Sequence, residues 1–251
     1  MTMRVCAIIP TYDNPATIGE VVRRVRAYVP DLVVVDDGSR EEAKAVLREV
    51  AATYACEVVW RPDNGGKGAA VKTGLQWARE HGYTHALQID ADLQHDPAKI
   101  PELLASIRGP DTVVLAAPVF DASAPKGRLR ARKITTFFAM VETLSFRVGD
   151  PLCGFRVYPV ETALAVKARG DAMDFDPEIA VRLAWAGCEI VHVPTPVIYR
   201  SAADGGVSHY RGFVDTALIG FTHAWLCTEG LLRLITWPVR RLWRAATRKR
   251  G

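Results

Sequence analysis

The sequence contains few cysteines and lacks any long hydrophobic run. Its five cysteines are widely spaced along 251 residues, and Cys153 and Cys188 are the closest pair. This spacing excludes a Cys-x-x-Cys redox pair and a zinc knuckle, and it favours a reducing compartment.

The longest uncharged run, Thr216 to Thr228, has thirteen residues, whereas a membrane-spanning helix needs about 20. We therefore expect no transmembrane helix. Because Asp13 comes too early for a signal-peptide core, we expect a cytoplasmic location.

Acidic residues are absent from the end of the chain. From Gly230 onward there are seven basic residues and no acidic one, although the whole chain carries a net charge of only +4. Trp225, Trp237 and Trp243, half of the six tryptophans, alternate here with aliphatic and basic residues, as in helices at a membrane interface. We predict that residues 213–251 form amphipathic helices, interrupted at Pro238, that bind an anionic membrane surface rather than nucleic acid. The alternative is a helix packed on the domain with a solvated cationic face.

The first 120 residues alternate short β-branched runs with helical patterns. This order predicts an α/β domain over residues 1–212, with a mostly parallel, Rossmann-like sheet flanked by helices. Asn14 and Asp96 each precede a proline, which is typical of an N-cap followed by the first helical residue. The polar, basic stretch Pro118–Lys133 predicts a surface loop. The expected strands are Val5–Ile9, Leu32–Val35, Val58–Trp60, His85–Ile89, Thr112–Ala117 and Ile190–Ile198; the expected helices are Pro15–Ala27, Glu41–Tyr54, Gly68–His81, Pro97–Ile107, Ile134–Arg147, Pro159–Ala168 and Pro177–Ala186.

Polar loops follow the first four expected strands. The carboxyl ends of parallel strands meet at one edge of a sheet, where α/β proteins bind their ligands. The first loop lacks Gly-x-Gly-x-x-Gly, and the third lacks the spacing of a Walker A loop, so neither a dinucleotide cofactor nor ATP hydrolysis is supported. The four loops are Pro10–Asp13, Asp36–Ser39, Asn64–Gly68 and Asp90–Asp92.

The acids after the fourth strand predict a metal site. Asp90 and Asp92 are two positions apart, so both carboxylates can reach one cavity from the same side of the chain. Hard oxygen donors suit Mg²⁺ or Mn²⁺, which take further ligands from substrate phosphates. Gln94 and His95 follow closely and could add a ligand or a hydrogen bond. The plainer interpretation is a solvated turn, with Asp96 capping the next helix.

Six motifs follow one another over about the first 210 residues. They are IIPTYDN (Ile8–Asn14), VVVDDGS (Val33–Ser39), NGGKGAAVKTG (Asn64–Gly74), DADLQHDP (Asp90–Pro97), GFRVYP (Gly154–Pro159) and IYR…GVSHYRGF (Ile198–Phe213). With these motifs the chain resembles the family 2 glycosyltransferases, which have the GT-A fold, and within them the dolichol-phosphate-mannose synthase-like branch. One departure is Asp13, where the family usually has Asn followed by Glu.

The resemblance implies a nucleotide-sugar donor, a UDP- or GDP-sugar, held with a divalent metal. The metal ligands would be Asp90, Asp92 and Gln94, and Asp92 would take part in catalysis. The donor-binding residues would be Pro10, Tyr12, Asp13, Asp37, Gly66, Lys67, Asp90 and Ala91.

The resemblance also implies residues on the acceptor side. Asp150 is the candidate catalytic base, with Asp176 and Glu178 as rivals that have ordinary helix-start explanations. A base is needed only if the acceptor is a hydroxyl, because a phosphate is already ionised. Guanidinium groups match phosphate oxygens, and the arginines implied to hold an acceptor phosphate are Arg128, Arg130, Arg132 and Arg200.

We therefore predict an inverting, metal-dependent glycosyltransferase, peripheral on the cytoplasmic face of a membrane, that transfers a sugar to a lipid-linked acceptor, above all a polyprenyl phosphate. One alternative acceptor is a hydroxyl of another glycolipid or amphipathic metabolite. A less favoured alternative is a sugar nucleotidyltransferase, an enzyme type that usually has a glycine-rich loop with an arginine after the first strand. Here that loop is Pro10–Asp13.

Overall fold

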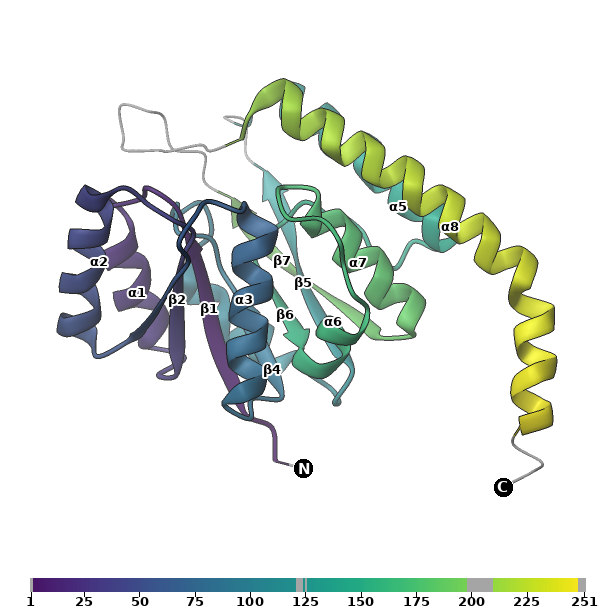
Figure 1. Cartoon of the computed structure of the whole chain (residues 1–251), viewed down its shortest axis with the longest axis horizontal. Helices are drawn as coiled ribbons and strands as arrows, with labels where there is room; N and C mark the ends of the chain where they lie inside the picture. Colours follow the sequence, from purple (N-terminus) through teal and green to yellow (C-terminus); the bar gives the residue numbers. More distant parts are fainter. Residues whose placement is uncertain (1, 121–123, 125, 198–209, 248–251) are drawn as a thin grey trace.

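The computed structural model describes residues 2–120, 124, 126–197 and 210–247, and residues 237–247 by their backbone alone. Strands and helices alternate over the first 120 residues, as expected from the sequence (Figure 1). The strands are β1 (Val5–Thr11), β2 (Leu32–Asp36), β3 (Glu57–Trp60), β4 (His85–Gln88), β5 (Thr112–Phe120), β6 (Arg156–Pro159) and β7 (Glu189–Val197). The helices are α1 (Ile18–Arg26), α2 (Glu41–Tyr54), α3 (Lys67–Glu80), η1 (Pro97–Lys99), α4 (Ile100–Ala105), α5 (Lys126–Thr143), α6 (Val160–Ala165), α7 (Phe175–Ala186) and α8 (Gly212–Thr247).

In the described part of the chain, the strands form one mixed sheet of seven strands in the order β3-β2-β1-β4-β6-β5-β7. Only β6 runs antiparallel to its neighbours, with Gln88 of β4 opposite Arg156 and Leu115 of β5 opposite the same residue. The other paired strands are parallel. This arrangement confirms the predicted mostly parallel α/β sheet flanked by helices.

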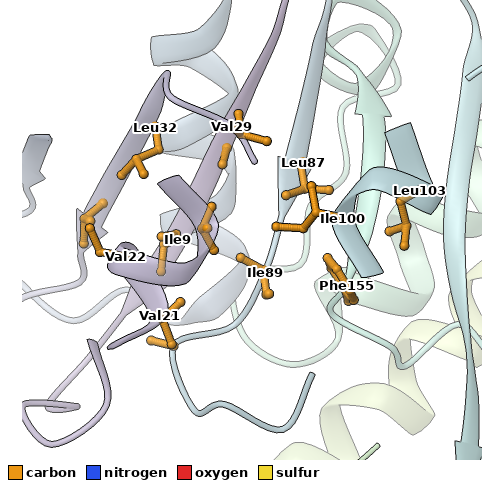
Figure 2. Close-up of a cluster of buried hydrophobic side chains, with 14 of the residues drawn as sticks. Ile9, Val21, Val22, Val29, Leu32, Leu87, Ile89, Ile100, Leu103 and Phe155 are labelled. Carbon is orange, nitrogen blue, oxygen red and sulfur yellow. The ribbon is translucent and has the colours of Figure 1, made fainter. Parts of the chain in front are cut away.

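The sheet has a hydrophobic layer on each face, because successive side chains of a strand point to opposite sides. In β1, Ala7 and Ile9 pack with residues of α1, α2 and α4 (Figure 2), whereas Cys6 and Ile8 pack with residues of α3, α6 and α7. Burial on both faces explains why the first two strands are runs of apolar residues without polar alternation.

Local expectations from the sequence are wrong at two places. The side chain of Asn14 donates to the carbonyl of Tyr12 instead of capping a helix, and α1 begins only at Ile18. The basic stretch expected as a loop continues β5 to Phe120 and then forms the first turns of α5. Its charges suit a helix because most of them lie on exposed positions, while Thr135 and Ala139 of the same helix are buried.

The C-terminal region is one continuous helix, not several short ones. Helix α8 runs through Pro238, and it bends in its yellow part in Figure 1. A proline removes one helical hydrogen bond and bends a helix without having to end it. The first half of α8 packs on α5 and α7, where Ile219, His223 and Leu226 are buried. None of the helices in the described part of the chain has the length and hydropathy needed to cross a membrane.

Helix α3 packs on β1 through Gly74, which gives a stability prediction. A Cβ at this position would overlap the Ile8 side chain, so Gly74→Ala should lower the free energy of unfolding by about 1–3 kcal/mol in chemical denaturation. Gly220→Ala is the matched control, because nothing lies within 4 Å of its Cβ position in α8. It should leave stability unchanged or raise it by about 0.5–1 kcal/mol. Equal effects of both changes would contradict this account of the α3–β1 contact.

Candidate active site

The loops at the carboxyl ends of β1 and β2 are joined by hydrogen bonds. The backbone N–H of Asp13 donates to Ser39 Oγ at 2.9 Å, and the Asp13 carboxylate accepts from the backbone and Nε of Arg40 at 2.9 and 2.8 Å. Asp13 has a positive φ of 47°, a conformation that Asp tolerates better than most residues. Pro10 lies near the end of β1 and Tyr12 directly follows the strand, so this part of the predicted donor-binding set lies together at the carboxyl end of β1.

Asp37 holds the glycine-rich loop that precedes α3. Its two carboxylate oxygens accept the backbone N–H groups of Gly65 and Gly66 at 3.1 and 2.7 Å, and Arg61 Nε lies 2.8 Å away. Burial raises the pKa of Asp37, against the lowering effect of these partners. Gly66 has a φ of 97°, and a side chain there would meet the carbonyl of Asp171. The loop therefore needs glycine at this position.

Lys67 is the first residue of α3, and its ammonium group bridges two carboxylates. Lys67 Nζ lies 2.7 Å from Asp90 Oδ2 and 2.9 Å from Asp176 Oδ2. Burial alone would lower the pKa of Lys67, but the two acids raise it above its usual value. Burial opposes ionisation of Asp176 as well, yet Lys67 and Arg156 hold the pKa of Asp176 below its usual range. Arg156 is fully buried and donates to the carbonyls of Cys153, Pro151 and Asp176.

Asp92 lies close to Asp90 and is only partly exposed. Its Oδ1 accepts the backbone N–H of Gln94 at 3.0 Å. Burial, and then the charge of Asp90, raise the pKa of Asp92, as expected for two acids at one site. The carbonyl of Ala91, between them, accepts from Thr17 Oγ1 at 2.6 Å.

The residues at this edge fit a divalent cation whose remaining ligands come from a substrate. A Cβ at position 154 would overlap Asp90 Oδ2 and Lys67 Nζ, so the absence of a side chain at Gly154 allows both groups to lie against its backbone. In the described part of the chain, no three His, Cys, Asp or Glu side chains are grouped so that they alone could hold a metal. A pair of carboxylates that needs phosphate oxygens to complete the coordination is typical of Mg²⁺ sites.

The candidate base Asp150 and the arginine Arg132 contact each other. Arg132 Nη1 donates to both oxygens of Asp150 at 2.9 and 2.8 Å, and the backbone N–H of Leu152 donates to Oδ1 at 2.9 Å. Each side chain is about one sixth exposed. Arg132 also lies over the ring of Phe120. The structure thus joins two residues that the sequence analysis assigned to separate roles.

The two rival candidates for the catalytic base, Asp176 and Glu178, are buried and bound to other protein groups. Asp176 lies inside the first turn of α7, which begins at Phe175, so it is not an N-cap. Glu178 Oε2 accepts the backbone N–H groups of Arg169 and Gly170 at 2.8 and 2.6 Å, and its Oε1 accepts from Arg182 at 2.6 Å. Asp150 also has a cationic partner, Arg132, but its side chain is about one sixth exposed, whereas Asp176 and Glu178 are buried.

The structure shows less about the other arginines that were predicted to hold an acceptor phosphate. Arg128 and Arg130 lie at exposed positions in the first turns of α5. Arg200 lies outside the described residues, as does most of the glycine-containing stretch from Gly206 to Tyr210.

Sequence patterns assigned no role to Arg156 or Gly154, and they offered Asp176 only as a base. Arg156 could have been noticed as a single charge within an apolar strand, because a charge is buried only when it is paired. The contact of Asp176 with Lys67 spans 109 positions, and no local pattern indicates it.

Comparisons with known proteins identify the family of this chain. The family model for glycosyl transferase family 2 matches residues 6–163, so the chain belongs to this family of enzymes. An undecaprenyl-phosphate mannosyltransferase of Micrococcus luteus is 30% identical over 250 residues, which cover 91% of this chain and 98% of the relative. A polyprenol monophosphomannose synthase of Mycolicibacterium smegmatis is 29% identical, covering 84% and 82% of the two chains. These relatives confirm the predicted dolichol-phosphate-mannose synthase-like branch.

Solved structures show the same fold. Glucosyl-3-phosphoglycerate synthase of Mycobacterium tuberculosis, crystallised with Mn²⁺, UDP-glucose and phosphoglyceric acid, has a TM-score of 0.68 and 17% identity. The match covers 90% of this chain and 80% of that one. It confirms the predicted GT-A fold.

The buried pair of Asp176 and Arg156 gives a prediction of pH-dependent stability. The pKa of Asp176 is lowered by folding, so its contribution is full above the unfolded value of about 3.9 and is lost as the pH falls through the folded value. Asp176→Asn should cost about 3 kcal/mol at pH 7, because it leaves buried cations without a counter-charge. The difference from the wild type should shrink below about pH 4, as measured by urea unfolding.

The matched control is Asp171→Asn, since Asp171 pairs with Lys72 at 2.6 Å but is largely exposed. It should change stability by less than about 1 kcal/mol at any pH. A constant cost of Asp176→Asn from about pH 7 to about pH 2 would contradict the assigned ion pair.

Proposed function

We propose that this protein is an inverting, divalent-metal-dependent glycosyltransferase that moves a sugar from a nucleotide-diphosphate sugar to a polyprenyl phosphate. The observation that carries the proposal is the pair Asp90 and Asp92 at the carboxyl edge of the sheet, with Lys67 at 2.7 Å from Asp90. Two carboxylates and an ammonium group are the parts that a metal and a diphosphate need.

The donor side is built from the loops after β1, β2, β3 and β4. Pro10, Tyr12 and Asp13 would border the base, and Asp37 would lie near the ribose while it fixes the N–H groups of the glycine loop. Asp90, Asp92 and Gln94 would hold Mg²⁺ or Mn²⁺. The metal would draw charge from the departing nucleotide diphosphate. The mycobacterial glucosyl-3-phosphoglycerate synthase was crystallised with Mn²⁺ and UDP-glucose, which supports this type of donor and metal without deciding between UDP and GDP.

The acceptor side is built from the chain between β5 and β6. Inversion requires the acceptor oxygen to approach the anomeric carbon in line with the leaving group, so the acceptor must be held opposite the diphosphate. Arg132 is the best placed described residue to hold an acceptor phosphate, with Arg128, Arg130 and Arg200 as further candidates. The names of the relatives, which mention undecaprenyl phosphate and polyprenol, support a polyprenyl phosphate as the acceptor.

The presence of Asp150 supports a second class of acceptor, a hydroxyl group. If the acceptor is a hydroxyl of a glycolipid, Asp150 would take its proton, and Arg132 would then have to release the carboxylate it now binds. With a phosphate acceptor no base is needed, and Asp150 would instead orient Arg132. Competition between a polyprenyl phosphate and a neutral polyprenol or glycolipid acceptor separates the two.

Exposed apolar side chains on α5 and α8 support action at a membrane surface. Monomeric soluble proteins rarely expose large contiguous apolar patches, and basic residues follow along α8 in sequence. Each basic residue near an anionic surface adds about 1 kcal/mol of attraction. We propose that residues 213–251 form a membrane-binding region on the cytoplasmic face. The apolar side chains on these helices, together with Leu144 and Phe146 just after α5, are all more than two fifths exposed: Ile134, Phe137, Val141, Leu144, Phe146, Phe213, Val214, Phe221, Trp225, Leu231, Leu232, Leu234 and Ile235.

Asp92→Asn tests the proposed reaction. Replacing the carboxylate by a neutral group of the same shape should lower sugar transfer by about 100-fold or more, while the thermal melting curve stays that of a folded protein. Transfer is measured as lipid-linked product from a nucleotide sugar and a short polyprenyl phosphate with Mn²⁺. Asp96→Asn is the control, because Asp96 caps η1 and pairs with Arg24. Normal turnover and metal requirement in the Asp92 variant would refute the assignment.

Removal of residues after Glu229 tests the membrane-binding region. The loss of basic and apolar residues should reduce sedimentation with anionic vesicles, and the reduction should be greatest at low salt because charge attraction is least screened there. Neutral vesicles of the same size are the control. Unchanged partitioning of the shortened chain would contradict the proposed role.

A further inference from the structure

We propose that Lys67 binds Asp90 in the empty donor site. It releases Asp90 when a nucleoside diphosphate binds the ammonium group instead. The metal would then bind together with the diphosphate and not ahead of it. This inference rests on the proposed function, and it adds an order of binding that depends on one side chain.

The carboxylate oxygens of the proposed metal site are largely occupied by protein donors. Asp90 Oδ2 accepts from Lys67 Nζ at 2.7 Å, and Asp90 Oδ1 lies 3.3 Å from Gln88 Nε2. Asp92 Oδ1 accepts from the backbone of Gln94. Of the four oxygens of the two acids, only Asp92 Oδ2 has no partner among the hydrogen bonds of the described residues. A carboxylate oxygen has two lone pairs, so a metal that binds Asp90 Oδ2 would share this oxygen with the ammonium group of Lys67 and would lie close to its positive charge.

Lys67 is the donor that can leave. Its other partner, Asp176, is buried and fixed by Arg156, so the ammonium group keeps one counter-charge when it releases Asp90. The long stem of lysine and its three N–H donors allow the group to turn. The Nζ atom lies against the backbone of Gly154, where a side chain would overlap it.

The charges of the cluster explain why the diphosphate is needed. Asp90, Asp92 and Asp176 carry three negative charges against two positive charges on Lys67 and Arg156. A divalent metal alone would make this largely buried cluster net positive and would lie against the ammonium group. A diphosphate supplies the missing negative charge and offers Lys67 new oxygens to bind.

The test is Mn²⁺ binding to the full-length protein, measured by the electron paramagnetic resonance signal of free Mn²⁺. In the wild type, Mn²⁺ alone should bind weakly, and UDP or GDP should tighten its binding by about tenfold or more. Lys67→Met should bind Mn²⁺ alone about tenfold more tightly than the wild type, because Asp90 is released. The same variant should bind the diphosphate less tightly, and most of the coupling between the two ligands should be lost.

Lys72→Met is the matched control. Lys72 lies on the same helix and pairs with Asp171 at 2.6 Å, so its loss removes the same charge without touching Asp90. Its Mn²⁺ affinity should stay within about twofold of the wild type. Equal tightening in both variants would show a general charge effect and would overturn the proposal.

Unchanged or weaker Mn²⁺ binding in Lys67→Met overturns the proposal, as does wild-type binding that is equally tight with and without the diphosphate. If Lys67→Met fails to fold by circular dichroism, Lys67→Gln replaces it, and the wild type is compared with UDP and with uridine. The proposal requires the diphosphate, so equal effects of UDP and uridine would overturn it. Failure of the proposed function shows itself separately, as a wild type that transfers no sugar, and the Mn²⁺ titrations do not depend on that result.

Discussion

The ammonium group of Lys67 holds together three parts of the chain that are distant in sequence. It belongs to the start of α3, and it binds one acid after β4 and another in the first turn of α7. A buried ammonium group is costly without partners, so each of these segments can take its place only when the others are in theirs. The same contact brings the loop before α3, the acids after β4 and the N-terminal turn of α7 to one point.

Glycines make this convergence possible. Gly66 adopts a backbone conformation that side chains disfavour, and a side chain at Gly154 would fill the space beside the acids. Gly74 performs a related role in the fold, because it allows α3 to lie close to β1. Small residues thus set both the position of α3 against the sheet and the close approach of Lys67 and Asp90 at its N-terminal end.

Local patterns in the sequence predicted most of the fold and much of the site. Runs of apolar residues indicated β1, β2, β4 and β5, because strands buried on both faces have few polar residues. The sequence also indicated Asp37, Lys67, Asp90 and Asp92, which follow strands. Sequence patterns failed at two places. The charged residues of α5 were interpreted as a loop, and Pro238 was interpreted as the end of a helix. It could not reveal the pairing of Asp150 with Arg132 or of Asp176 with Lys67, because contacts between distant segments depend on the folded topology.

The direction of β6 has a consequence for how such an enzyme can diversify. Parallel strands end at the edge where the acids lie, but an antiparallel strand begins there, so Arg156 stands opposite Gln88 at that edge. The chain from Phe120 to Arg156 therefore leaves the sheet and returns to it on the same side. Helix α5 lies within this segment and contributes no strand, so its sequence can change without altering a strand pairing of the described residues.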